Sequence, residues 1–126
     1  MVESAVKGVK ADLHTVPRDT RIHPVYAEDV GEATRLIHQS KSLGHYIYNV
    51  ADGNNPAMIE VAETIRDLIP NSEIVLGPVG AEPATFRGVD VHRMKREFGF
   101  EFRNLRTGLE EYIRWMRVTT IDDWRT

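Results

Sequence analysis

Cysteine is absent from the 126-residue sequence. This excludes disulfide bonds, thiolate zinc sites, iron–sulfur clusters and a cysteine nucleophile, and it is compatible with a reducing cytoplasm, where we expect the protein to reside. Long apolar runs are also missing, so the sequence predicts no membrane-spanning helix, and the first residues contain no secretory signal pattern. With 41% hydrophobic and 28% charged residues, the chain has the composition of an ordinary globular domain.

An excess of positive charge is also missing, since the sequence has sixteen basic and nineteen acidic side chains and a formal net charge of −3. This balance argues against a general nucleic-acid-binding protein. Residues 86–117 are the exception, because eight basic side chains lie there and seven of them are arginines. Guanidinium groups suit phosphate and carboxylate ligands, although a helix face with paired charges explains the same excess more simply.

Helix and strand patterns alternate along the chain and are joined by short turns rich in glycine, proline and asparagine. Residues 2–7 fit the last turns of a helix, and further helices are predicted over residues 29–40, 56–69, 90–99 and 104–117. Extended segments are predicted over residues 13–16, 22–26, 45–50 and 73–76, of which His-Tyr-Ile-Tyr-Asn-Val at 45–50 is the strongest strand candidate. The pattern predicts one small mixed α/β lobe of short strands and about four helices over residues 1–117, with a tail over 118–126.

Helix boundaries and a core follow from individual side chains. Asp29 and Glu32 form a capping-box pattern, and Asn55, Asp90 and Asn104 each stand where an N-cap side chain would begin a helix. Apolar residues at helical spacing predict that two helix faces share one core. The expected core residues are Val61, Ile65, Leu68, Leu109, Tyr112, Ile113 and Met116.

Catalytic and metal-binding patterns are missing from the sequence. No two of the five histidines have the i,i+4 spacing that brings two imidazoles to one metal, and no serine lies in a nucleophile-elbow pattern. Gly77 and Gly80 belong neither to a dinucleotide fingerprint nor to a P-loop. We therefore name no catalytic, cofactor-binding or metal-ligating residue in this chain.

Four segments nevertheless resemble the motifs of one enzyme family, in the same order and with similar separations. Residues 22–31 read Ile-His-Pro-Val-Tyr-Ala-Glu-Asp-Val-Gly, and residues 48–53 read Tyr-Asn-Val-Ala-Asp-Gly before Glu-Val-Ala-Glu-Thr-Ile at 60–65. Residues 90–100 read Asp-Val-His-Arg-Met-Lys-Arg-Glu-Phe-Gly-Phe, and residues 105–116 contain Gly-Leu-Glu-Glu and Ile-Arg-Trp. Together they are similar to the C-terminal part of the extended short-chain dehydrogenase/reductases, the NAD(P)-dependent sugar epimerases and dehydratases.

This resemblance, which covers roughly residues 2–117, implies the substrate-binding lobe of a Rossmann-type oxidoreductase or isomerase. In that family an N-terminal Rossmann domain holds NAD or NADP with a Gly-x-x-Gly-x-x-Gly loop and carries a Tyr-x-x-x-Lys catalytic pair. Neither pattern occurs in this sequence. We therefore expect a portion of a larger enzyme that lacks the Rossmann domain, holds no cofactor and is inactive alone. Two alternatives are a free-standing small-molecule-binding module and one chain of a split enzyme.

The resemblance also implies a sugar or nucleotide-sugar-like substrate, whose diphosphate is often bound by arginines in this family. Arg87 matches a basic position of some members, three residues before Asp90, and Arg21 lies one residue from another such position. Arg87 is therefore the first candidate for a substrate contact and Arg21 the second, while pairing with Glu82 or plain solvation explains Arg87 equally well. We also expect an apolar face that packs against the missing Rossmann domain or a partner chain, and that makes a homo-oligomer possible.

We predict that this chain binds neither NAD nor NADP with useful affinity. The physical reason is that the backbone N–H groups of a glycine-rich loop, together with the following helix N-terminus, normally hold the pyrophosphate. Isothermal titration calorimetry of the purified chain with each dinucleotide checks the prediction. Micromolar binding of either one would contradict it.

Overall fold

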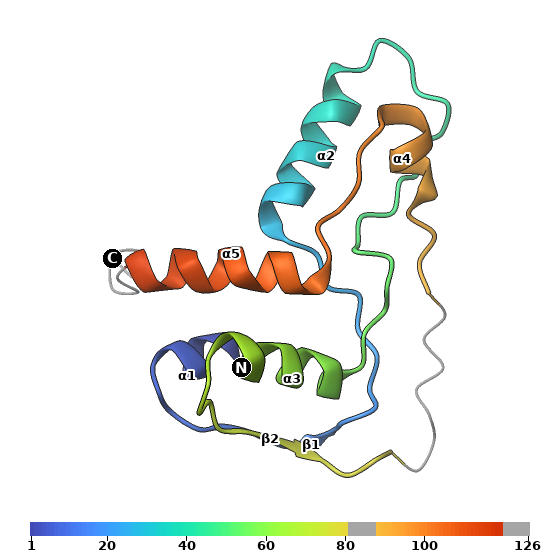
Figure 1. Ribbon diagram of the computed structural model, residues 1–126. Coiled ribbons are helices and arrows are strands. Elements are labelled where there is room, and N and C mark those ends of the chain that lie inside the picture. Colours follow the sequence, from blue (N-terminus) through green and yellow to red (C-terminus); the bar gives the residue numbers. More distant parts are fainter. Residues whose placement is uncertain (81–87, 120–126) are drawn as a thin grey trace.

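The computed structural model describes residues 1–80 and 88–119 (Figure 1). These residues form a two-stranded sheet and five helices, so the predicted mixed α/β class is confirmed, and residues 2–6 form a short helix of their own. The elements in chain order are α1 (Val2–Val6), β1 (Ala11–Pro17), α2 (Ala27–Gln39), α3 (Met58–Leu68), β2 (Ile74–Gly77), α4 (His92–Phe98) and α5 (Leu105–Val118).

The sheet consists of β1 and β2, which run parallel although two helices separate them in the chain. Its register places Ala11 opposite Ile74. Parallel strands need a long crossover connection, and the chain between residues 18 and 73 provides it. At the end of β2 the two strands come very close together. A Cβ on Gly77 would lie 2.5 Å from the His14 carbonyl oxygen, so this position requires glycine.

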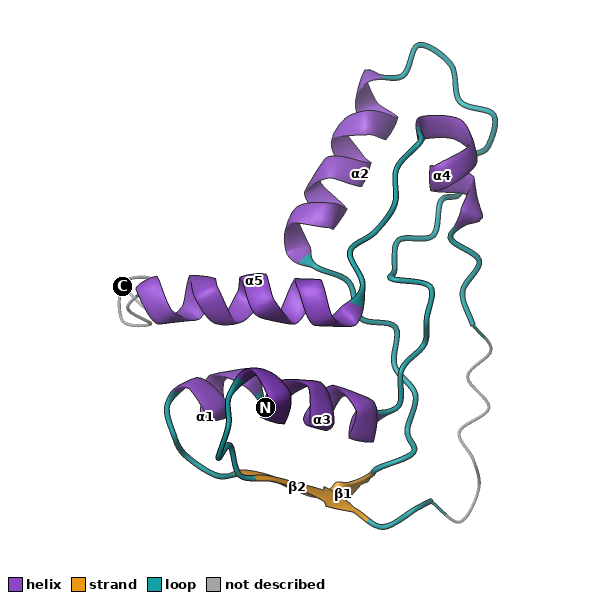
Figure 2. Cartoon of the chain, in the orientation of Figure 1, coloured by secondary structure: helices purple, strands orange, loops and turns teal. Residues whose placement is uncertain are grey.

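The main core lies between the sheet and three helices. α3 packs on β2, and α5 packs on both α1 and α3 (Figure 2). α3 forms because its apolar residues recur at helical spacing, and it ends just before Pro70, which cannot continue a helix. The buried residues of this core are Val2, Ala5, Ala11, Val61, Ala62, Ile65, Ile74, Ile113 and Met116.

α2 and α4 form a second part of the molecule, on the far side of α5 from the sheet (Figure 1). Ala33 of α2 and Met94 of α4 are fully buried, although neither belongs to the main core. α4 ends at Gly99, whose left-handed conformation (φ 63°) is the ordinary glycine end of a helix. The described residues therefore bury side chains outside the main core as well, and α5 lies between the two parts of the molecule.

The strand predicted over residues 45–50 is wrong. This segment pairs with no strand in the described part of the chain, and the Ile47 side chain is 69% exposed. Its polar contacts go to α4 instead: the Tyr48 hydroxyl donates to Glu97 (2.5 Å), and the Ile47 carbonyl accepts from Arg93 (2.7 Å). High strand propensity does not by itself form a strand, because the hydrogen-bond ladder needs a second strand.

The capping box predicted at Asp29 and Glu32 is also wrong. α2 begins at Ala27, so Asp29 lies inside the first turn of the helix, where its carboxylate contacts Arg103. Glu32 binds the Arg35 guanidinium one turn further on (2.5 Å). The local pattern fails here because a distant arginine provides a stronger partner than the helix backbone.

The other three predicted caps have different outcomes. Asn104 is confirmed, since its side chain accepts a hydrogen bond from the Thr107 N–H at 2.9 Å. Asn55 is not the cap of α3, because it adopts a left-handed conformation (φ 52°) two residues before the cap residue. Asp90 stands one residue before the cap of α4, although its carboxylate still accepts from the His92 N–H (2.8 Å).

The predicted core is largely confirmed, with one correction. Four of the seven residues are buried (Val61, Ile65, Ile113 and Met116), and Leu68 and Leu109 pack against the core while partly buried. Tyr112 is wrong, because it is 39% exposed and stacks on Trp115, with ring centroids 5.9 Å apart. α5 runs one residue past the predicted boundary at 117, and residues 120–126 of the predicted tail lie outside the described residues.

Replacing Ile65 by alanine should lower the free energy of unfolding by about 2–5 kcal/mol, because a fully buried side chain leaves a cavity in the core. Urea denaturation followed by circular dichroism measures the change. The matched control is Val118→Ala on α5, where a side chain that is 79% exposed should change stability by less than about 0.5 kcal/mol. If Ile65→Ala, Val118→Ala and the parent all have the same free energy of unfolding, the core is misassigned.

Candidate functional site

A buried ion pair joins the start of α2 to the start of α5. Asp29 in the first turn of α2 is only 4% exposed. One of its carboxylate oxygens accepts the backbone N–H of Arg103 (2.8 Å), and the other contacts the Arg103 guanidinium. Arg103 stands two residues before α5, so this single carboxylate fixes both the backbone and the side chain of the turn that leads into that helix.

Three carboxylates and an aromatic ring surround the Arg103 side chain. Besides Asp29, the guanidinium lies 3.3 Å from a carboxylate oxygen of Glu111 and 3.4 Å from one of Glu28. Its central carbon lies 4.9 Å from the centroid of the Tyr26 ring, within the range of a cation–π interaction. The positive charge of Arg103 is therefore balanced within the protein, and this arginine is poorly suited to bind a phosphate.

The charges of this cluster shift two pKa values. Burial lowers the pKa of the Arg103 guanidinium, but the nearby charges of Asp29, Glu111 and Glu28 outweigh that effect and hold its pKa above the usual value. Burial, reinforced by the negative charges of Glu28 and Glu111, raises the pKa of the Tyr26 hydroxyl. Tyr26 therefore remains protonated at neutral pH, and it can donate a hydrogen bond but is a poor proton acceptor in catalysis.

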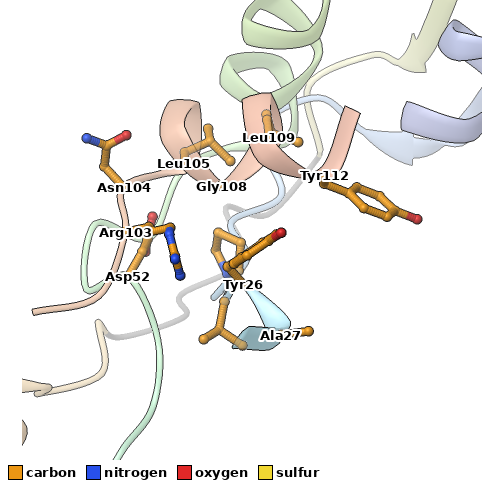
Figure 3. A pocket seen from close by; sticks show the side chains of 11 residues that line it. Tyr26, Ala27, Asp52, Arg103, Asn104, Leu105, Gly108, Leu109 and Tyr112 are labelled. Atoms are coloured by element: carbon orange, nitrogen blue, oxygen red, sulfur yellow. The ribbon is translucent and has the colours of Figure 1, made fainter. Parts of the chain in front are cut away.

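A cavity of about 270 Å³ opens beside this ion pair (Figure 3). Figure 3 shows Asp52 and Arg103 at one end of the cavity and Tyr112 at the other. Its walls come from the segment before α2, from the turn at Asp52 and from the first turns of α5, and they are mostly apolar. The lining residues are Pro24, Val25, Tyr26, Ala27, Asp52, Arg103, Asn104, Leu105, Gly108, Leu109 and Tyr112.

Of the two predicted substrate contacts, Arg21 lies among the described residues and Arg87 lies outside them. Arg21 does not line the cavity. Its guanidinium donates to the Asn55 carbonyl (2.9 Å), and its backbone pairs with Ala57 in an isolated antiparallel bridge, so it holds the segment before α2 against the turn before α3. Its side chain forms no ion pair with any carboxylate in the described part of the chain, in contrast to Arg103.

Sequence reasoning missed Arg103 and gave Asp29 the wrong role. The available signal was that Asp29 matches the Asp of the family-like segment at residues 22–31, which indicates a role other than helix capping. Nothing in the sequence around Arg103 identifies its partner, because 74 residues separate the two side chains.

Metal and membrane sites receive no support from the described residues. They contain no group of three or more histidine or acidic side chains placed to hold a metal ion. No described helix is both long enough and apolar enough to cross a membrane.

Comparison with solved structures identifies the fold. The chain resembles the Bordetella bronchiseptica enzyme WbmF in complex with NADH (TM-score 0.75, 22% identity, 92% of this chain and 34% of that chain). It also resembles the UDP-N-acetylglucosamine 4-epimerase from Bacillus cereus (TM-score 0.71, 22% identity, 94% of this chain and 39% of that chain). A third neighbour is the dTDP-glucose 4,6-dehydratase from Bacillus anthracis in complex with NAD (TM-score 0.70, 22% identity, 92% of this chain and 37% of that chain). WbmF has also been solved with NAD⁺ and UDP.

These matches confirm the sequence-based resemblance at the level of the fold. The chain shares the fold of part of these three enzymes, and it spans little more than a third of their length. No protein-family model matches the chain. No curated protein sequence matches it either.

Replacing Arg103 by alanine should lower the free energy of unfolding by about 3–5 kcal/mol, because it leaves the Asp29 carboxylate buried without its counter-charge. Urea denaturation followed by circular dichroism measures the loss.

The matched control is Glu28→Ala, which removes a carboxylate that is 70% exposed and also faces Arg103. This variant should lose less than about 1 kcal/mol, as is usual for an exposed ion pair. Equal losses for Arg103→Ala and Glu28→Ala would contradict the assignment of Asp29 as the partner that matters.

Proposed function

We propose that residues 1–117 form the substrate-binding part of an NAD(P)-dependent sugar epimerase or dehydratase-like enzyme. The observation that supports this most directly is the structural match over 92–94% of the chain to a UDP-N-acetylglucosamine 4-epimerase and a dTDP-glucose 4,6-dehydratase. The order of the four family-like segments in the sequence gives separate support. On this proposal the protein works in the cytoplasm.

The cofactor would come from outside this chain. The sequence contains neither the glycine-rich dinucleotide loop nor the Tyr-x-x-x-Lys pair, and hydride transfer needs a nicotinamide held against the reacting carbon. A Rossmann domain would therefore supply NAD or NADP and the catalytic tyrosine, either in the same protein or as a partner chain. The present chain would then bind and orient the substrate and would not catalyse the reaction alone.

The proposed substrate is a sugar or a nucleotide sugar. Two of the structural neighbours are named for nucleotide sugars, and WbmF has been solved with UDP. A diphosphate needs a cationic side chain that is not already neutralised. Arg21 meets this requirement better than Arg103, because it is exposed and forms no ion pair among the described residues. Arg87 remains the other proposed contact.

UDP-N-acetylglucosamine should bind this chain through its diphosphate, and Arg21→Lys and Arg87→Lys should each weaken binding by about 1.5–3 kcal/mol, because lysine lacks the planar fork of two N–H donors. Titration of ¹⁵N-labelled protein followed by NMR measures the affinity. N-acetylglucosamine, which lacks the diphosphate, should bind more weakly.

The control variant is Arg106→Lys, at an exposed arginine on α5 that already pairs with Glu110 (3.2 Å) and should leave binding unchanged. Thermal melting of each variant shows whether the fold is retained. If UDP-N-acetylglucosamine causes no shifts, the proposed substrate class is wrong. If all three lysine variants bind like the parent, Arg21 and Arg87 are not the diphosphate contacts.

A further inference from the structure

A groove of about 530 Å³ lies along α5, next to the cavity beside the ion pair. Its walls come from α1, from the start of α2 and from the second half of α5. Tyr26, Ala27 and Tyr112 line both the groove and the cavity, so the two hollows adjoin at the tyrosine rings (Figure 3). Together they have the size of an ordinary small-molecule site.

Three aromatic side chains line the groove, namely those of Tyr26, Tyr112 and Trp115. The Tyr112 and Trp115 rings are stacked on each other, and they are 39% and 45% exposed. The Tyr26 ring already interacts with one cation, because the Arg103 guanidinium carbon lies 4.9 Å from its centroid. Tyrosine and tryptophan rings attract organic cations through the negative charge of their π electrons. The groove therefore presents the aromatic surface that such cations favour.

The charged side chains that line the groove are acidic. They are Glu3 and Glu28, and no lysine or arginine of the described part of the chain lines it with them. Glu3 pairs with Lys7 at 2.6 Å. Glu28 is 70% exposed, and its contact with Arg103 is long, at 3.4 Å. A positively charged ligand group can therefore approach the Glu28 carboxylate from the groove.

The ion cluster next to the groove adds further negative charge. Arg103 supplies one positive charge, which it shares among the carboxylates of Asp29, Glu28 and Glu111. Burial raises the pKa of the Tyr26 hydroxyl, and the negative charges of Glu28 and Glu111 raise it further. Charges that hold a proton on a neighbouring group also favour a bound cation and repel an anion. The groove is thus unsuited to a diphosphate.

We propose that the groove and the adjoining cavity bind an organic ammonium ion with an apolar body. The ammonium group lies between the Glu28 carboxylate and the aromatic rings, which attract it by charge and by cation–π interaction. The apolar body enters the cavity, whose walls include Val25 and Leu105. This site is distinct from the arginines proposed for the diphosphate, and it does not rest on the nucleotide-sugar proposal.

Three probes that share a phenyl ring and differ in charge test the proposal: phenethylammonium, phenethyl alcohol and phenylacetate. Each is titrated into the ¹⁵N-labelled chain and followed by NMR. Phenethylammonium should bind about fivefold or more tightly than the neutral alcohol, and phenylacetate should bind most weakly. The shifts should be largest at residues 26–28 and 112–116. Added salt should weaken the binding of phenethylammonium and leave that of the alcohol unchanged, because salt screens exposed charges.

Glu28→Gln should weaken phenethylammonium binding by about two- to fivefold, the range of an exposed ion pair, and leave the alcohol unaffected. The matched control is Glu110→Gln, since Glu110 is an exposed carboxylate on α5 that does not line the groove. It should change neither affinity. Trp115→Leu keeps an apolar side chain but removes the ring, so it should weaken the cation by about two- to fivefold and the alcohol by less. Thermal melting shows whether each variant retains the fold.

Equal affinity for the three probes, tightest binding of phenylacetate, or equal effects of Glu28→Gln and Glu110→Gln would overturn this site. Light scattering tests a competing use of the same rings. If the parent chain dimerises and Trp115→Leu is monomeric, the rings belong to an interface between copies and the proposal is wrong. The titration with UDP-N-acetylglucosamine is a separate test, because that ligand carries the opposite charge and is proposed to bind elsewhere.

Discussion

The ion pair between Asp29 and Arg103 is the contact on which the two parts of this molecule depend. A carboxylate as buried as Asp29 is costly unless it is paired and hydrogen-bonded, and Arg103 meets both needs through its guanidinium and its backbone N–H. Because Asp29 lies in α2 and Arg103 leads into α5, the pair fixes the α2 and α4 part against the helix that closes the main core. Arg103 also lines the cavity beside this ion pair.

The same ion pair determines how positive charge is distributed over the molecule. Arg103 is surrounded by Asp29, Glu28 and Glu111, so its charge is compensated inside the protein. Arg21 uses one guanidinium nitrogen for a backbone carbonyl and keeps its charge exposed. The cavity is therefore mostly apolar, and a phosphate group is better accommodated near Arg21.

Two exposed features lie outside the main core. One is the stacked pair of Tyr112 and Trp115 on α5, next to a groove that Tyr26 and Glu28 also line. The other is the uncharged segment over residues 45–50. Both expose aromatic rings that an isolated domain of this size would usually bury. The apolar face expected for a lobe that packs on a Rossmann domain fits the first feature, and its occupancy by a partner stays a prediction.

Local patterns in the sequence were sufficient for the elements that are stabilised locally. Asn104 caps α5 because its side chain needs only the backbone three residues ahead, and α3 and its core face follow from apolar spacing and a proline stop. The order of the family-like segments also gave the correct fold, since it reflects the whole chain and not one helix.

The tertiary structure alone decided the features that depend on residues far apart in the sequence. Asp29 carries a capping pattern, yet its carboxylate binds Arg103, 74 residues away. Residues 45–50 have the composition of a strand, yet no described strand lies beside them. Tyr112 has the spacing of a core residue, yet it stacks on Trp115 at the surface. Composition and spacing thus determined which elements form, whereas the partner of each polar or aromatic side chain was set by chain segments that meet only in the folded molecule.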